Sequence, residues 1–225
     1  MEIIPGIHQV DAVIGNSYLI ARDDIVVIDT GLPGSGKKIL SYIRNILHRE
    51  PSDISTVVLT HCHTDHIGGV KALKDAAPGL KVAIHSADAG YVDRTDPLPR
   101  YPGLRGLAVG LFTRLLTPKF VPDIHFKDGD RVAGLACIHL PGHTPGSAAF
   151  LDEVTGTLFA GDLLRWDGTS LSEGPTGFTM DPAASRNSIR KIASLPFNTL
   201  LTGHGKPLRP GAAETVREFT RSLPE

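Results

Sequence analysis

The chain has 225 residues, of which 41% are hydrophobic and 21% are charged, and its formal net charge is −1. These values are typical of a globular protein that buries a core without disulfides or structural metals, so we expect any metal to serve chemistry. Lys and Arg form no basic run, which argues against a nucleic-acid partner.

The start of the chain, residues 1–5, lacks the basic and apolar regions of a signal peptide, and no apolar run is long enough to cross a membrane. The two cysteines, Cys62 and Cys137, form no CxxC motif, so we do not expect a disulfide framework. These features predict a cytoplasmic protein with no membrane partner.

The first half of the chain alternates between strand and helix patterns. Residues 25–28 are β-branched throughout and predict a buried strand, which Asp29 follows. Apolar residues at helical spacing predict a helix over 37–48. In chain order we expect a turn at 15–17, strands at 25–28, 57–59 and 82–84, and helices at 37–48 and 68–77.

The second half is richer in short strands. We expect strands at 131–140, 148–151, 157–160 and 199–201, and helices at 182–194 and 212–223. Mixed strands with helices between them predict an α/β fold, a four-layer αββα sandwich with two mixed sheets between helical layers. We expect one domain over residues 1–225.

Residues 88–126 fit this plan less well. They contain five prolines and an apolar stretch over 104–116. One interpretation is a packed loop with one helix. The other is a lid or a homodimer surface beside the active site, because long loops in compact domains are often functional.

The run His61-Cys62-His63-Thr64-Asp65-His66 places four potential metal ligands directly after a predicted strand. Imidazole and carboxylate groups suit Zn, Fe or Mn. In an extended turn His61 and His63 point the same way and Cys62 points away. Asp65 and His66 fall where a helix begins and can face a neighbouring point. This spacing favours two adjacent metals over one.

Three later segments repeat the same arrangement. His143, Asp162 and His204 each follow a predicted strand, and each has a glycine directly before it. Strand ends are where α/β sheets build sites, and glycine permits turns that other residues resist. We therefore expect these three residues to join the first four.

The order His-x-His-x-Asp-His, then a histidine, an aspartate and a histidine, resembles the metallo-β-lactamase superfamily. Asp29 matches that family's first motif, and the resemblance runs over residues 6–207. It implies the αββα sandwich with two divalent metal ions held between the sheets. Zn is the first expectation for these ions, and Fe or Mn the alternatives. The resemblance also implies a role for each residue: His61, His63 and His143 hold metal one; Asp65, His66 and His204 hold metal two; Asp162 bridges both; and Asp29 orients a ligand.

The resemblance predicts a hydrolase that cleaves a thioester, a lactone or another small ester of a small-molecule substrate through a metal-bridging hydroxide. Asp65 is the candidate to take or relay the proton. A histidine at the position of His66 and an aspartate at that of Asp162 resemble the ligand sets of the glyoxalase II and lactonase branches. Zinc β-lactamases generally lack the bridging aspartate. The chain ends shortly after His204, so we expect no glyoxalase II helical extension.

Two alternatives remain open from the sequence. Persulfide dioxygenases share almost the same motif but use one iron, and the His-Cys-His run around Cys62 resembles theirs. The second alternative is a binding protein that has lost catalysis, which the seven ligand-type residues disfavour. We expect residues 88–126 and 165–179, with Trp166 and Phe178, to shape the substrate pocket.

Overall fold

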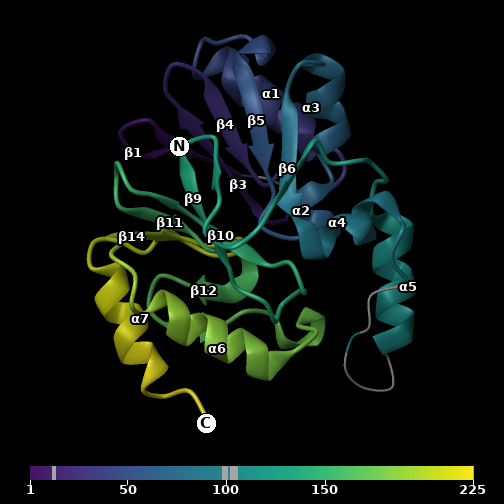
Figure 1. The fold of residues 1–225 in the computed structure, drawn as a ribbon. Coiled ribbons are helices and arrows are strands. Elements are labelled where there is room, and N and C mark those ends of the chain that lie inside the picture. The colour runs from purple at the N-terminus through teal and green to yellow at the C-terminus, as the bar shows by residue number, and fades with distance from the viewer. Residues whose placement is uncertain (12–13, 98–100, 102–105, 225) are drawn as a thin grey trace.

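A computed structural model describes residues 1–11, 14–97, 101 and 106–224 (Figure 1). Most strands and helices predicted from a regular hydrophobic pattern are present at the expected positions, with shifts of a few residues at their ends. Asn16 and Ser17 lie in a strand and were predicted in the turn before it. None of the helices in the described ranges is both long enough and apolar enough to cross a membrane.

Over the described ranges the first sheet has seven strands in the order β1 to β7. Strands β1 to β4 are antiparallel to their neighbours, and β4 to β7 run parallel. Their bounds are β1 Glu2–Ile4, β2 Ile7–Asp11, β3 Asn16–Ala21, β4 Ile25–Ile28, β5 Ile54–Val58, β6 Lys81–His85 and β7 Ile124–Phe126. Because β4 and β5 are parallel, Asp29 and the loop after β5 meet at one sheet edge.

Within the same described ranges the second sheet has five strands in the order β14-β11-β10-β9-β8, of which only β11 and β14 are parallel. Their bounds are β8 Arg131–Val132, β9 Leu135–His139, β10 Ala148–Asp152, β11 Thr157–Phe159 and β14 Thr199–Leu201. The single strand predicted over 131–140 is wrong. Ala133 and Gly134 take φ values of 48° and 80°, which turn the chain into a hairpin.

Helices cover the outer faces of both sheets (Figure 1). Helices α1 (Ser35–Asn45) and α3 (Val70–Ala76) pack Ile39 and Leu73 onto the first sheet. Helices α6 (Pro182–Ile192) and α7 (Ala212–Thr220) pack Ile189 and Val216 onto the second. Phe126, Phe150 and Phe159 fill the core between the sheets. These layers confirm the four-layer αββα sandwich.

The segment 88–126 holds more regular structure than either interpretation predicted. It begins inside α4 (Ser86–Asp93), contains α5 (Gly106–Leu116) and ends with β7. Residues 98–100 and 102–105 lie outside the described part. Figure 1 shows α5 at the periphery, outside the sandwich.

Strands β1 and β7 and helix α4 were not predicted, and neither were two further short strands and three 3₁₀ helices. Strands β12 (Leu164–Trp166) and β13 (Leu171–Glu173) form a ribbon after the Asp162 segment. The 3₁₀ helices are η1 (Pro51–Asp53), η2 (Gly161–Leu163) and η3 (Thr176–Phe178).

Candidate metal centre

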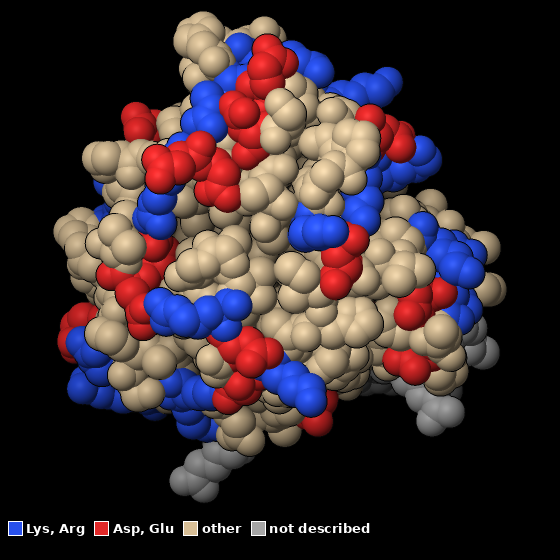
Figure 2. All heavy atoms as spheres, turned by 45° about the horizontal axis from the view of Figure 1, so that its top comes forward, with Lys and Arg blue, Asp and Glu red and all other residues tan. Residues whose placement is uncertain are grey.

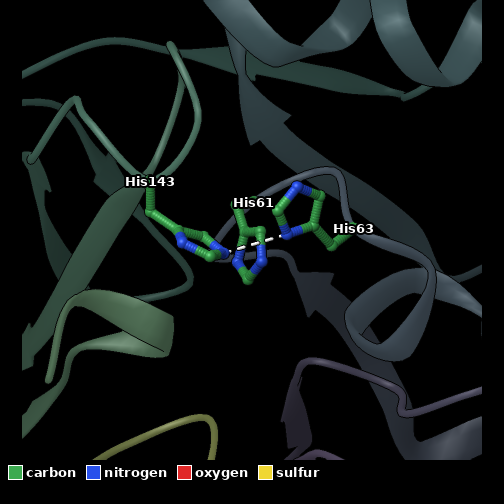
Figure 3. A group of neighbouring side chains, drawn as sticks. All are labelled: His61, His63 and His143. Carbon is green, nitrogen blue, oxygen red and sulfur yellow. Dashed lines mark hydrogen bonds between the residues drawn. The ribbon is translucent and has the colours of Figure 1, made fainter. Parts of the chain in front are cut away.

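The loop after β5 carries the first candidate ligands. Strand β5 ends at Val58, and helix α2 (Thr64–Ile67) begins directly after His63. His61 and His63 are buried, and Figure 3 shows their rings meeting the ring of His143, which comes from the loop after β9. His143 Nε2 lies 2.9 Å from His63 Nδ1. Three histidines predicted to share a metal thus lie together.

The other four predicted ligands form a second group beside the first. Asp162 Oδ1 lies 3.2 Å from His66 Nε2, and its Oδ2 lies 3.3 Å from His204 Nε2. Asp65 Oδ2 approaches the same His204 nitrogen at 3.2 Å. Asp162 Oδ2 is also 3.6 Å from His143 Nε2 in the first group. Asp162 therefore lies between the two groups.

Both groups fit divalent metals. Within each group the candidate ligand atoms lie within 4.8 Å of one another. Three of their buried atoms make no hydrogen bond to any described residue: His61 Nε2, His66 Nε2 and Asp162 Oδ1. His66 Nε2 and Asp162 Oδ1 face each other at 3.2 Å, whereas His61 Nε2 has no hydrogen-bond partner among the described residues. A buried polar atom without a partner costs about 1–3 kcal/mol, a cost that a bound cation would relieve. Imidazole and carboxylate donors suit Zn, Fe or Mn.

The two groups differ in protonation. Burial lowers the pKa of His63 to about 3 and of His143 to about 4, and it lowers that of His61 well below the usual value. These neutral rings offer lone pairs at neutral pH. Burial alone would also lower the pKa of His204, but Asp162 and Asp65 raise it to about 9. A metal ion bound by the second group would therefore displace a proton from His204.

Asp29 contacts His66 directly and His61 through Thr60, so it orients one histidine of each group. Its carboxylate accepts hydrogen bonds from Thr60 N at 2.8 Å and from Thr60 Oγ1 at 2.7 Å. The same carboxylate lies 2.7 Å from His66 Nδ1, and Thr60 Oγ1 lies 3.0 Å from His61 Nδ1. These contacts leave the Nε2 atoms of His61 and His66 facing the centre, which is what the predicted orienting role of Asp29 requires.

Two supporting residues were missed by the sequence reasoning. The buried carboxylate of Asp88 accepts hydrogen bonds from Cys62 N, Thr144 Oγ1 and Gly146 N at 2.9, 2.7 and 2.6 Å. The hydroxyl of Tyr101 lies 2.8 Å from His63 Nε2. Neither residue belongs to a ligand motif. The only sequence signal was that both lie in or near the segment proposed as a lid.

The remaining predicted residues lie outside the ligand groups. The side chain of Cys62 is buried in the core between the first sheet and its helices. It points away from His61 and His63, as predicted. His85 and His139 stack on each other with ring centroids 4.0 Å apart and belong to neither group. Trp166 packs against the outer core of the second sheet, away from the lining of the pocket.

A cavity of about 530 Å³ opens beside the candidate ligands. Four of the seven lie on its wall: His63, Asp65, Asp162 and His204. Apolar side chains form much of the rest, among them Leu32, Leu116 and Phe178. Leu116 comes from the 88–126 segment and Phe178 from the 165–179 segment, so both segments predicted to shape the pocket contribute to it.

Residues 10–204 match the family model described as the metallo-beta-lactamase superfamily. This match covers most of the chain, and the protein belongs to that superfamily. The sandwich agrees with the fold of a solved metallo-beta-lactamase family protein of Thermus thermophilus, and the two His/Asp groups could each hold a metal ion.

Several known proteins are similar to the chain. The probable metallo-hydrolase YflN of Bacillus subtilis is 29% identical, over 100% of this chain and 90% of its own length. A hydroxyacylglutathione hydrolase of Aeromonas hydrophila is 29% identical, over 82% of this chain and 58% of its own length. The solved structure of TTHA1623 in a di-iron-bound form has a TM-score of 0.69 and 29% identity, and the match covers 93% of this chain and 97% of that one.

Proposed function

We propose that the protein is a hydrolase with a dinuclear metal centre that cleaves a thioester, a lactone or another small ester. The observation that carries this proposal is the position of Asp162, whose carboxylate lies within 3.6 Å of histidine nitrogens from both groups. A carboxylate between two ligand sets suits a bridge between two ions. The similarity to YflN, a probable metallo-hydrolase, and to a hydroxyacylglutathione hydrolase supports the same class.

Two divalent ions at such a centre supply an activated water and stabilise negative charge on the substrate carbonyl oxygen. His61, His63 and His143 would hold one ion, and Asp65, His66 and His204 the other, with Asp162 shared. The di-iron form of TTHA1623 shows that a related chain takes two metal ions. Zn is our first choice for this chain, with Fe or Mn accepted by the same donors.

Asp65 is the candidate catalytic residue of the chain. It is partly exposed to the cavity, and its Oδ2 lies 3.2 Å from His204 Nε2. Its carboxylate can accept a proton from the attacking water. The water oxygen forms the new bond to the carbonyl carbon, the bond from that carbon to sulfur or oxygen breaks, and the leaving group takes the proton from Asp65.

Metal analysis and a substrate panel test this proposal together. We expect two metal ions per chain and hydrolysis of at least one member of a panel of simple thioesters and lactones. One iron per chain, with oxygen uptake in the presence of glutathione persulfide, would instead establish the dioxygenase alternative. Bound metals with no turnover on either assay would favour the inactive binding protein.

The remaining expectations from the sequence stay proposals. We propose a small-molecule substrate, a cytoplasmic location and no nucleic-acid partner. Figure 2 supports the last point for the face that it shows, where positive and negative side chains are interspersed and no broad basic patch appears. We also propose a homodimer formed through residues 88–126.

A further inference from the structure

Two charged side chains on the cavity wall differ in whether another residue of the protein neutralises their charge. Besides the candidate metal ligands, the cavity is lined by one acidic residue, Glu173, and one basic residue, Arg165. Both carboxylate oxygens of Glu173 lie 3.1 Å from Nε of Arg186 on α6. The charge of Glu173 is thus neutralised from within the protein.

No acidic side chain among the described residues forms an ion pair with Arg165. Its backbone carbonyl accepts a hydrogen bond from Ser172 Oγ at 3.4 Å, but its guanidinium group makes no hydrogen bond or ion pair to the described residues. The five N–H donors of a guanidinium group in a cavity are then available to a ligand. The side chain of Arg165 is exposed, so its charge is accessible to a ligand that enters the cavity, whose wall also carries the apolar Leu32 and Phe178.

The fold directs Arg165 toward the candidate metal centre. Strand β12 follows Asp162 directly, and Leu164 points into the core, so the next side chain points the opposite way into the cavity. The Arg165 stem also passes beside the His204 loop, since a Cβ on Gly205 would lie 3.3 Å from Arg165 Cγ. Arg165 is therefore held between the segments that carry Asp162 and His204.

We infer that Arg165 binds a carboxylate carried by the substrate, at a distance from the bond that is cleaved. This inference rests on the proposed hydrolase function and narrows its substrate class to small esters or thioesters with an apolar body and one anionic end. A guanidinium group matches a carboxylate with two parallel hydrogen bonds. A doubly charged phosphate fits less well, because no second Lys or Arg lines the described wall of the cavity.

Matched thioesters test this inference. The hexanoyl and adipoyl thioesters of N-acetylcysteamine have acyl chains of equal length and differ in one terminal carboxylate. For the metal-loaded wild-type protein we expect kcat/KM for the adipoyl compound to be about tenfold higher, the value of one charge-assisted hydrogen bond. Arg165→Gln should bring the ratio of the two values close to one, and Arg165→Lys should give an intermediate ratio.

Arg44→Gln is the matched control. Arg44 is exposed on α1 and is absent from the cavity wall, so this variant makes the same chemical change and should keep the wild-type ratio. Equal rates for the two thioesters in the wild type would overturn the inference. So would a preference for the adipoyl compound that survives in Arg165→Gln.

Calorimetry separates a failure of this inference from a failure of the proposed function. If neither thioester is hydrolysed, the proposed activity on thioesters is wrong, but binding of adipate and hexanoate still tests Arg165. We expect adipate to bind about tenfold more tightly than hexanoate, with the difference lost in Arg165→Gln. Equal binding of both acids by the wild type would contradict a carboxylate site at Arg165.

Discussion

The carboxylate of Asp88 lies 2.9 Å from the backbone nitrogen of Cys62 and accepts its hydrogen bond inside the core. The other oxygen of the same carboxylate accepts a hydrogen bond from Gly146 N at 2.6 Å. Cys62 lies between His61 and His63, and Gly146 lies in the loop that carries His143. One buried side chain thus joins the two loops that form the first ligand group.

We predict that Asp88→Asn lowers metal affinity in the first group by about 10- to 100-fold, the usual effect of losing a partner that orients metal ligands. The asparagine amide nitrogen cannot accept a hydrogen bond, so one of the two loops loses its contact. Competition with a chromophoric chelator measures each site separately, and the site of Asp65, His66 and His204 should change less.

Asp93→Asn, on the same helix but outside both ligand groups, controls for a general change in α4. Circular dichroism confirms that the Asp88 variant is folded before its metal content is compared. Wild-type affinity at both sites would show that Asp88 serves packing alone.

The hydroxyl of Tyr101 makes a second contact of this kind, to His63 Nε2. Because His63 Nδ1 faces His143, a metal held at Nδ1 leaves the proton on Nε2, which then donates to the Tyr101 oxygen. We predict that Tyr101→Phe weakens metal binding about tenfold and retains the ring contact with Phe178.

The measurement is the metal dissociation constant of Tyr101→Phe beside that of Tyr91→Phe, which makes the same change on α4. The Tyr91 variant should behave as wild type. An unchanged affinity in Tyr101→Phe would mean that the hydroxyl does not set the orientation of His63.

Removing Asp162 tests the proposed bridge directly. We predict that Asp162→Ala lowers metal content below two ions per chain and reduces hydrolysis by at least about 100-fold, because the shared carboxylate is lost from both groups. Elemental analysis and initial rates on the responsive substrate give the two readings. Asp167→Ala, in the exposed turn between β12 and β13, is the control. Full activity with two bound metals would disprove the bridging assignment.

The sequence predicted the elements and candidate ligands that depend on local pattern. The β-branched run at 25–28 and the helical spacing near residue 40 are local signals, and both elements formed there. The seven candidate ligands were found because their order along the chain is itself a pattern. The structure brings all seven together in two adjacent groups, although their role as ligands stays a prediction.

The residues that were missed depend on contacts between distant segments. Asp88 meets Gly146 across 58 positions of the chain, and Tyr101 meets His63 across 38, so no local window contains either pair. The hairpin within 131–140 was missed for a different reason. Ala133 adopts a left-handed conformation, which costs energy for a residue with a Cβ and is not expected from its identity.

His85 makes stability depend on pH. Burial, with the neighbouring His139, lowers the pKa of His85 to about 4, whereas in the unfolded chain it is near 6.5. Between these two values the unfolded chain holds a proton that the folded chain does not. The free energy of unfolding therefore falls as the pH drops from 6.5 toward 4, and above 6.5 His85 contributes no pH dependence.

We predict that His85→Asn loses about 2 kcal/mol less stability than the wild type between pH 7 and pH 5. Asparagine does not titrate, and its side-chain oxygen can still accept the hydrogen bond that His85 Nδ1 accepts from Ala87 N at the start of α4. Urea unfolding at both pH values gives the comparison, and His125→Asn at an exposed position of β7 is the control. Equal losses in wild type and His85→Asn would refute the assignment.

Helix α5 provides the surface for the proposed homodimer. Leu111 and Leu115 are 50% and 73% exposed, and their spacing of four places them on one face of the helix. Exposed apolar side chains that share a face are typical of association surfaces.

We predict that the wild type is a dimer by light scattering after gel filtration, and that Leu115→Glu shifts it to monomer with its metal content unchanged. Val154→Glu changes an equally exposed residue, 81% accessible in the turn between β10 and β11, and should leave the dimer intact. A wild type that stays monomeric at high micromolar concentration would leave α5 with a role at the pocket alone, where Leu116 lines the wall.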